Sequence, residues 1–276
     1  MNLEILNNNI KKNLMNKISI AIPTYYSSKF ISQTIESLKS HSIINEIIIC
    51  DDSDDAIEYK SLKNTVSKLL ENKEIELNIS KNSKNLGGFK NKYLCIEKVS
   101  NEFVYQIDSD NIANPKSLKA ISNFNLATLD NSILYLPSKI YLFNKSKNER
   151  FFKPSNNVIY SKNTKVVSPL EVKDILINNK KFVKSRNIGW LLNTGNPFVS
   201  KKSYLEFLKP GLSRTESILA ACSIALVYYW LNSGNSISIS RFLSHYHRLR
   251  SDSYFVSRGD IAVKSINYFK EQIKNI

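Results

Sequence analysis

The sequence predicts an α/β protein with a mostly parallel sheet flanked by helices and a smaller second lobe. Over residues 18–125, short apolar runs alternate with segments of helical periodicity, which is the pattern of βαβ units. Three of the apolar runs end at polar clusters, as strands do at the binding edge of such sheets. With 276 residues and no repeat or linker, we expect one domain, with a first half over 17–125, a second half over 126–255 and a C-terminal helix over 256–276.

The first half is predicted as alternating strands and helices. Ser28 can open a helix, and Pro115 can occupy the first turn of another. Strands are expected at 18–22, 46–50, 75–79 and 103–107, and helices at about 28–38, 62–70 and 89–99.

The second half is less regular. Strands are expected at 132–136 and 140–143, and helices at 168–178, 200–208 and 213–231. Ser168 and Ser213 each begin a capping box, and Gly234 should end the last of these helices. The apolar stretch 217–231 has 15 residues, fewer than the ~20 of a membrane-spanning helix, so we interpret it as a buried helix.

The composition is that of a globular, basic protein. Hydrophobic residues make up 42% and the formal net charge is +15, which favours anionic partners such as nucleic acid, phospholipid headgroups or phosphorylated substrates. A solvated basic surface is the open alternative. Cys50, Cys95 and Cys222 lack metal-ligand spacing and suggest buried free thiols in a reducing compartment. Because residues 1–17 lack the apolar core of a signal peptide, we expect a cytoplasmic location, with contact to the inner face of the membrane left open.

The most informative segment is the apolar run that ends at Asp108-Ser109-Asp110. Residues spaced i, i+2 point the same way in an extended chain, so Asp108 and Asp110 can share one ligand. Carboxylate oxygens suit Mg²⁺ or Mn²⁺, which bind through one or two carboxylates plus substrate phosphates. A second Asp-Ser-Asp at 52–54 shows that the motif alone is weak. Asp108-Ser109-Asp110 is the stronger candidate for a ligand site because it directly follows a predicted strand.

Two other strand ends carry polar groups, Pro23-Thr24-Tyr25 and Asp51-Asp52. A parallel sheet places all three ends at one edge. Together with Asn85-Leu86-Gly87, their order and separation resemble the inverting GT-A glycosyltransferases of family 2 over residues 18–125. The resemblance implies a GT-A fold, a nucleotide-diphosphate-sugar donor and a Mn²⁺ or Mg²⁺ ion.

The resemblance also implies roles for single residues. Residues 17–125 would bind the nucleotide sugar and 126–255 would form the acceptor side. Asp51 or Asp52 would hydrogen-bond the base, Asp108 would face the ribose, and Asp110 would hold the metal together with Asp108. The remaining donor-binding residues would be Pro23, Thr24, Tyr25, Asn85, Gly87, Lys90 and Ser109. A solvated helix face is an equal alternative for Lys90.

The second half matches the family less completely. Gly195 and Asn196 resemble its acceptor-side segment, and Glu216 is the nearest candidate for the catalytic base. Glu216 is equally explained as the third residue of the capping box begun by Ser213. GT-A enzymes often complete the metal site with a C-terminal histidine, which points to His247, with Arg248 beside it to meet the diphosphate. A strand end with surface histidines remains the alternative.

The resulting hypothesis is an inverting, metal-dependent glycosyltransferase that acts on a hydroxyl of a surface-glycan or lipid-linked acceptor. A sugar-nucleotide nucleotidyltransferase is a second reading, but the glycine-rich start expected after its first strand is missing. A basic nucleic-acid-binding protein is a third, although Lys and Arg are scattered and no nucleic-acid motif is present.

Overall fold

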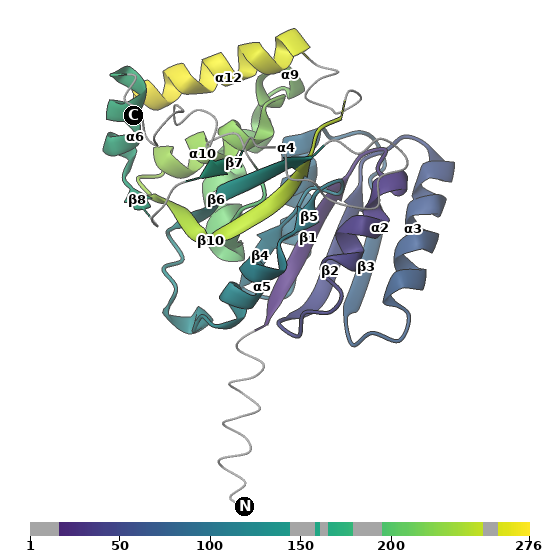
Figure 1. Ribbon diagram of the computed structural model, residues 1–276. Coiled ribbons are helices and arrows are strands. Elements are labelled where there is room, and N and C mark those ends of the chain that lie inside the picture. The colour runs from purple at the N-terminus through teal and green to yellow at the C-terminus, as the bar shows by residue number, and fades with distance from the viewer. Residues whose placement is uncertain (1–16, 144–157, 161–164, 179–194, 251–258) are drawn as a thin grey trace, which may run out of the picture.

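The computed structural model describes residues 17–143, 158–160, 165–178, 195–250 and 259–276. One mixed sheet runs through these residues in the strand order β3-β2-β1-β4-β9-β6-β10-β5, with β7 paired to β6 and β8 paired to β10. Figure 1 shows α2 and α3 together beside the parallel end of this sheet, and α10 and α12 together at the other end.

The first half confirms the alternation predicted from the sequence. Strands β1 to β4 are parallel to one another, so their carboxyl ends meet at one edge. The strands are β1 (Ile18–Thr24), β2 (Ile44–Asp51), β3 (Glu76–Lys81) and β4 (Phe103–Gln106). The helices are α2 (Ser28–Glu36), α3 (Ala56–Leu70), α4 (Gly88–Glu97) and α5 (Pro115–Ser122). A 3₁₀ turn, η1 (Leu126–Thr128), follows.

The second half mixes strand directions. Short β9 (Phe198–Ser200) is antiparallel to both β4 and β6 (Leu134–Phe143), and it joins the two halves of the sheet. The long β10 (Ile237–Arg248) is parallel to β6. The remaining elements are β5 (Ile112–Ala113), β7 (Val158–Tyr160), β8 (Lys165–Val167), α6 (Pro169–Ile177), α8 (Lys201–Leu208), η2 (Lys209–Ser213), α9 (Glu216–Leu219), α10 (Cys222–Asn232) and α12 (Gly259–Lys274).

Two predictions for the second half were wrong. The two strands expected at 132–136 and 140–143 are one strand, β6, because Pro137 is accommodated opposite Ser240, where the pairing with β10 shifts register. The single helix expected over 213–231 is two helices, α9 and α10. Ser265 of α12 accepts a hydrogen bond from the Ala221 N–H (3.1 Å), and its hydroxyl donates to the Ile218 carbonyl (2.5 Å), so contacts with α12 replace helical bonds at this point.

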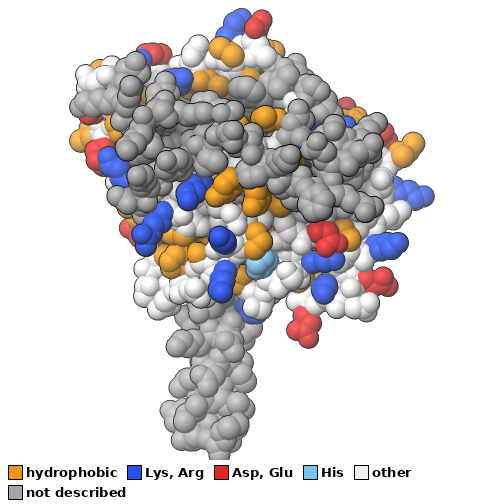
Figure 2. Space-filling model, in the orientation of Figure 1, with side chains coloured by type: hydrophobic (Ala, Val, Ile, Leu, Met, Phe, Trp, Pro, Cys, Tyr) orange, Lys and Arg blue, Asp and Glu red, His pale blue; other side chains and the backbone are white. Residues whose placement is uncertain are grey.

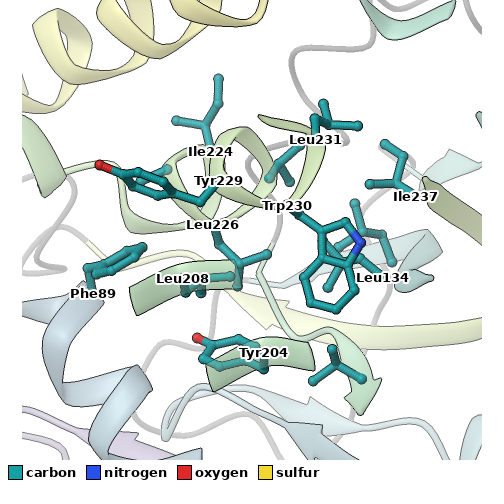
Figure 3. Packing of buried hydrophobic residues seen from close by; sticks show 14 of the residues in the cluster. Phe89, Leu134, Tyr204, Leu208, Ile224, Leu226, Tyr229, Trp230, Leu231 and Ile237 are labelled. Carbon is teal, nitrogen blue, oxygen red and sulfur yellow. The ribbon is translucent and has the colours of Figure 1, made fainter. Parts of the chain in front are cut away.

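The core lies on both faces of the sheet. The cluster on one face is built from α4, α8, α10 and α12 against β6 and β10, and Figure 3 shows Trp230, Tyr204 and Leu208 packed within it. The Trp230 indole N–H is within hydrogen-bond distance of the carbonyls of Ser132 (3.0 Å) and Ser236 (3.1 Å). Helix α10 is therefore a buried helix, as predicted. Within the described residues, no helix is both long and apolar enough to cross a membrane.

The three cysteines are free thiols. Cys50 and Cys95 are buried as predicted, whereas Cys222 is only partly buried because it begins α10 near the sheet edge.

Candidate active site

The carboxylates of Asp51 and Asp52 lie at the carboxyl end of β2 and have different surroundings. Asp51 Oδ1 accepts hydrogen bonds from the hydroxyls of Thr24 (2.9 Å) and Ser53 (2.8 Å). Asp51 Oδ2 is buried and has no hydrogen-bond partner among the described residues. Burial raises the pKa of Asp51 against the opposing effect of these hydrogen bonds. One oxygen is thus held in place while the other still lacks a donor.

Asp52 has its hydrogen bonds satisfied by the loop before α4. Its Oδ1 accepts from Leu86 N (2.8 Å) and Asn82 Nδ2 (2.8 Å), and its Oδ2 accepts from Gly87 N (2.9 Å). The exposed Asn85 also accepts from Gly87 N (2.9 Å). Gly87 has φ 80°, a conformation that favours glycine. Asp52 and Asn85 therefore shape the glycine segment.

The end of β1 combines buried and exposed residues. Thr24 is buried, and its carbonyl accepts from Asp52 N (2.9 Å), so it joins β1 to β2. Tyr25 and Tyr26 are each 39% exposed, with their rings in edge contact at 4.9 Å. Tyr26 has φ 47°, a strained value for a bulky residue, and its N–H donates to Ser53 Oγ (2.8 Å). Two aromatic rings thus stand at this strand end, next to Asp51 in the β1–β2 pairing.

Asp108 forms an ion pair with Lys92, which projects from α4. Lys92 Nζ lies 2.8 Å from Asp108 Oδ1, and the side chains are 10% and 28% exposed. Burial raises the pKa of Asp108, but Lys92, and to a smaller extent His247, outweigh it, so the net pKa is lowered. Burial lowers the pKa of Lys92, and Asp108 more than reverses this. Both groups are therefore charged at neutral pH.

The turn at Gly195 and Asn196 lies against the same carboxylate. Asn196 Oδ1 accepts a hydrogen bond from Asp108 N (2.8 Å). Gly195 has φ +64°, and a Cβ atom there would lie 3.2 Å from Asp108 Oδ2 and 3.3 Å from Ser223 Oγ. A side chain at position 195 would crowd the carboxylate. The structure thus brings Gly195 and Asn196 to Asp108.

Asp110 forms an ion pair with an arginine that follows β10. Arg250 lies 3.1 Å from Asp110 Oδ2. The Asp110 carbonyl accepts from Arg248 Nε (3.1 Å), and the guanidinium of Arg248 lies over the rings of Phe30 (4.7 Å) and Phe143 (4.6 Å). Arg248 thus lies beside Asp110.

The backbone of this turn is fixed by α2. The hydroxyl of Thr34 lies 2.8 Å from the carbonyl oxygens of Ser109 and Asn111. Ser109 is buried, whereas the Asp110 side chain remains 18% exposed. Asn111 Oδ1 accepts from Arg248 N (3.2 Å), which connects the turn to β10.

His245 and His247 lie on β10 with their ring centroids 5.9 Å apart. His245 is fully buried, and in the part of the chain that the structure describes neither ring nitrogen has a hydrogen-bond partner. Burial lowers the pKa of His245 to about 3, and the nearby His247 contributes to the shift, so His245 is neutral. His247 is half-buried and lies near enough to Asp108 to affect its pKa. Within the described ranges, no three His, Cys, Asp or Glu side chains group closely enough to hold a metal ion.

Glu216 is the first residue of α9, and its side chain lies outside the described part of the structure. The capping box predicted for Ser213 is wrong. The Ser213 hydroxyl donates to the Pro210 carbonyl (3.1 Å) at the end of η2, and Thr215 is the N-cap residue of α9. The capping explanation for Glu216 therefore no longer applies. Lys90 is half-exposed on α4.

Lys92, Arg250 and Tyr26 are the site residues that sequence reasoning missed. Lys92 and Asn91 follow Lys90 directly, but helical rotation directs both inward: Asn91 Nδ2 reaches Cys50 O (3.0 Å), and Lys92 reaches Asp108. A signal for Lys92 was available, since a lysine three residues after an inward Phe89 falls on the same helix face. For Arg250, the signal was the i, i+2 spacing from Arg248.

Known proteins resemble this chain in sequence and in structure. The sequence profile described as glycosyl transferase family 2 matches residues 19–165. No curated protein compared by sequence matches significantly. The crystal structure of S. aureus TarS 1–349 in complex with UDP-GlcNAc superposes with TM-score 0.60 at 20% identity, covering 94% of this chain and 70% of that one. The complex with UDP gives TM-score 0.56 at 21% identity, covering 94% and 69%.

A further crystal structure of S. aureus TarS superposes with TM-score 0.54 at 22% identity. The superposition covers 93% of this chain but 42% of that one. These likenesses show a shared fold, which is the GT-A fold predicted from the strand ends. The profile match covers more than half of the 276 residues. The chain therefore belongs to glycosyl transferase family 2, and it is a glycosyltransferase of the GT-A fold.

Proposed function

We propose that the protein transfers a sugar from a nucleotide-diphosphate sugar to a hydroxyl of a surface-glycan or lipid-linked acceptor, with inversion at the anomeric carbon and with Mn²⁺ or Mg²⁺ as cofactor. In this proposal residues 17–125 bind the donor and residues 126–255 form the acceptor side. The TarS complexes with UDP and UDP-GlcNAc make a uridine nucleotide the first donor to test.

The observation that carries the proposal is the unpartnered Oδ2 atom of Asp51. A buried carboxylate oxygen without a donor costs free energy, so a ligand N–H that reaches it would be favoured. A pyrimidine base offers such an N–H, and the exposed rings of Tyr25 and Tyr26 are available for stacking. Asp51 is the better candidate for the base than Asp52, whose oxygens are already bonded to the glycine segment.

The acidic pair fits a divalent ion. Asp108 is held ionised, and Asp110 Oδ2 already accepts a cationic partner, the guanidinium of Arg250. Hard carboxylate oxygens at a strand end suit Mg²⁺ or Mn²⁺ completed by phosphate oxygens and water. Asp110 would hold the ion, and Asp108 and His247 are the other proposed ligands. When bound, the ion would neutralise charge on the departing diphosphate.

Arg248 is the residue proposed to bind the departing diphosphate. Its guanidinium is oriented by the Asp110 carbonyl and by Gln33 Oε1 (2.5 Å), and the residue is buried, with the guanidinium over two aromatic rings. A guanidinium that is fixed in such surroundings interacts more strongly with phosphate oxygens.

Inversion needs one displacement step, with a base that removes the proton from the acceptor hydroxyl. Glu216 remains the proposed base.

The acceptor is proposed from surface charge. Figure 2 shows Lys and Arg side chains gathered over the part of the surface where β10 and α5 lie, and Lys116 and Lys119 of α5 are exposed. A basic surface beside the acceptor half favours an anionic glycan, or a lipid-linked acceptor at the anionic inner face of the membrane.

The test is a panel of nucleotide sugars, assayed for donor hydrolysis and thermal stabilisation with and without Mn²⁺. We expect one donor to be hydrolysed and to raise the melting temperature only with Mn²⁺, because ligands that bind the native state stabilise it. Asp110→Asn should retain the fold but lose both effects. If no nucleotide shifts the melting temperature while short DNA does, the nucleic-acid alternative replaces this proposal.

A further inference from the structure

Asp110 and Arg250 form an ion pair at the site proposed for the metal. The Arg250 Nη1 atom lies 3.1 Å from Asp110 Oδ2, and the two side chains are only 10% and 18% exposed. The guanidinium also lies 4.4 Å from the centre of the Phe30 ring. An ion pair this shielded from water is stronger than a surface pair. Any cation that binds Asp110 Oδ2 must therefore compete with Arg250.

The neighbouring Arg248 is held differently. Its hydrogen bonds go to neutral oxygens, those of the Asp110 carbonyl (3.1 Å) and Gln33 (2.5 Å). Its guanidinium shares the Phe30 ring with that of Arg250, and the two positive charges oppose each other. Neutralising the charge on Asp110 would leave both of these hydrogen bonds of Arg248 intact. Arg250 would lose its attraction to Asp110 and keep its repulsion from Arg248.

We propose that Arg250 is the resident counter-ion of Asp110 and changes partner when the donor binds, leaving the carboxylate to the divalent ion and pairing with the diphosphate. The inference rests on the proposed function and adds a donor-binding residue to it. Arg250 would keep Asp110 ionised and oriented in the donor-free protein. It would also lower the affinity for the ion until an anion is present to receive the guanidinium. Ion and diphosphate would then bind cooperatively.

The experiment measures Mn²⁺ binding by electron paramagnetic resonance and UDP binding by calorimetry, in the wild type and in Arg250→Gln. Without nucleotide, we expect Arg250→Gln to bind Mn²⁺ about three- to tenfold more tightly, because the competing cation is gone. With saturating Mn²⁺, the same variant should bind UDP about tenfold more weakly, because one guanidinium contact is lost. The matched control is Arg241→Gln, which removes an exposed arginine of β10, the strand that Arg250 follows. It should leave Mn²⁺ affinity unchanged.

The opposite shifts in Mn²⁺ and UDP affinity identify the exchange, since unfolding would weaken both. Arg250→Gln with unchanged or weaker Mn²⁺ binding would overturn the inference. An equal gain in Mn²⁺ affinity in Arg241→Gln would overturn it as well, because the loss of one positive charge anywhere on the protein would then explain the effect.

The variant Asp110→Asn separates this inference from the proposed function. If Asp110→Asn binds Mn²⁺ as the wild type does, the metal site of the proposed function fails too. If it loses Mn²⁺ while Arg250→Gln is unaltered, only the exchange fails.

Discussion

The ammonium group of Lys92 lies 2.8 Å from Asp108 Oδ1 and connects α4 to the end of β4. The preceding residue, Asn91, donates to the carbonyls of Cys50 (3.0 Å) and Thr24 (3.3 Å) at the ends of β2 and β1. Two consecutive residues of one helix therefore hold three strand ends. Because α4 begins directly after the glycine segment that Asp52 orders, this segment also positions Asp108.

Replacing Lys92 with Met should destabilise the protein by about 2 kcal/mol. The substitution leaves Asp108 charged and largely desolvated. The expected loss is below the roughly 3–5 kcal/mol of a fully buried pair, because Asp108 is 28% exposed. Urea denaturation measures the free energy of unfolding. Lys90→Met, at a half-exposed position of the same helix, should stay within about 0.5 kcal/mol of wild type. Equal losses in both variants would contradict a role for the ion pair.

The contribution of this pair should depend on pH in a defined direction. The pKa of Asp108 is lowered from 3.8, so its stabilisation is present above pH 3.8 and lost as pH falls through the folded-state pKa. The pKa of Lys92 is raised from 10.5, so its stabilisation is present below pH 10.5 and lost as pH rises through the folded-state pKa. The difference in unfolding free energy between wild type and Lys92→Met should be constant between these limits and shrink in acid. A difference that grows in acid would contradict this assignment.

Asp51→Asn and Asp52→Asn should have opposite phenotypes. In Asp52→Asn, either orientation of the amide places an NH₂ group against a backbone N–H, that of Leu86 or that of Gly87. We expect a loss of about 1–3 kcal/mol in unfolding free energy. In Asp51→Asn, the amide oxygen can still accept from Thr24 and Ser53 while the NH₂ replaces the unpartnered Oδ2. Its stability should stay near wild type.

The same pair of variants tests the base-binding assignment. In Asp51→Asn, a base N–H would meet an NH₂ group, so the affinity for UDP should fall about 10- to 100-fold. Calorimetry measures this directly, with thermal melting as the folding control. Wild-type UDP affinity in Asp51→Asn would remove Asp51 from the donor site and leave its partner Thr24 as the residue to test next.

The sequence predicted the parallel half of the fold well because local patterns and tertiary structure agree there. Each apolar run of 18–107 became a strand, and the three polar strand ends lie at one edge. The break between α9 and α10 was not predictable, since it depends on hydrogen bonds to Ser265, more than 40 residues away. The partners of the two site carboxylates were also missed. Lys92 comes from α4 and Arg250 from the segment after β10, and no local spacing relates them to Asp108 and Asp110.

Glu216→Gln is the sharpest test of the proposed base. Glu216 begins α9 after the N-cap residue Thr215, so the substitution removes no capping box and forfeits only a favourable acidic charge at a helix start. That charge is worth about 0.3–1 kcal/mol, and melting and UDP affinity should remain close to wild type. A glutamine cannot accept the proton of the acceptor hydroxyl, so sugar transfer should fall by ~10²–10⁴. Transfer retained within a few-fold would reject Glu216 as the base. The donor-site proposal would be unaffected, because it rests on Asp51, Asp108 and Asp110.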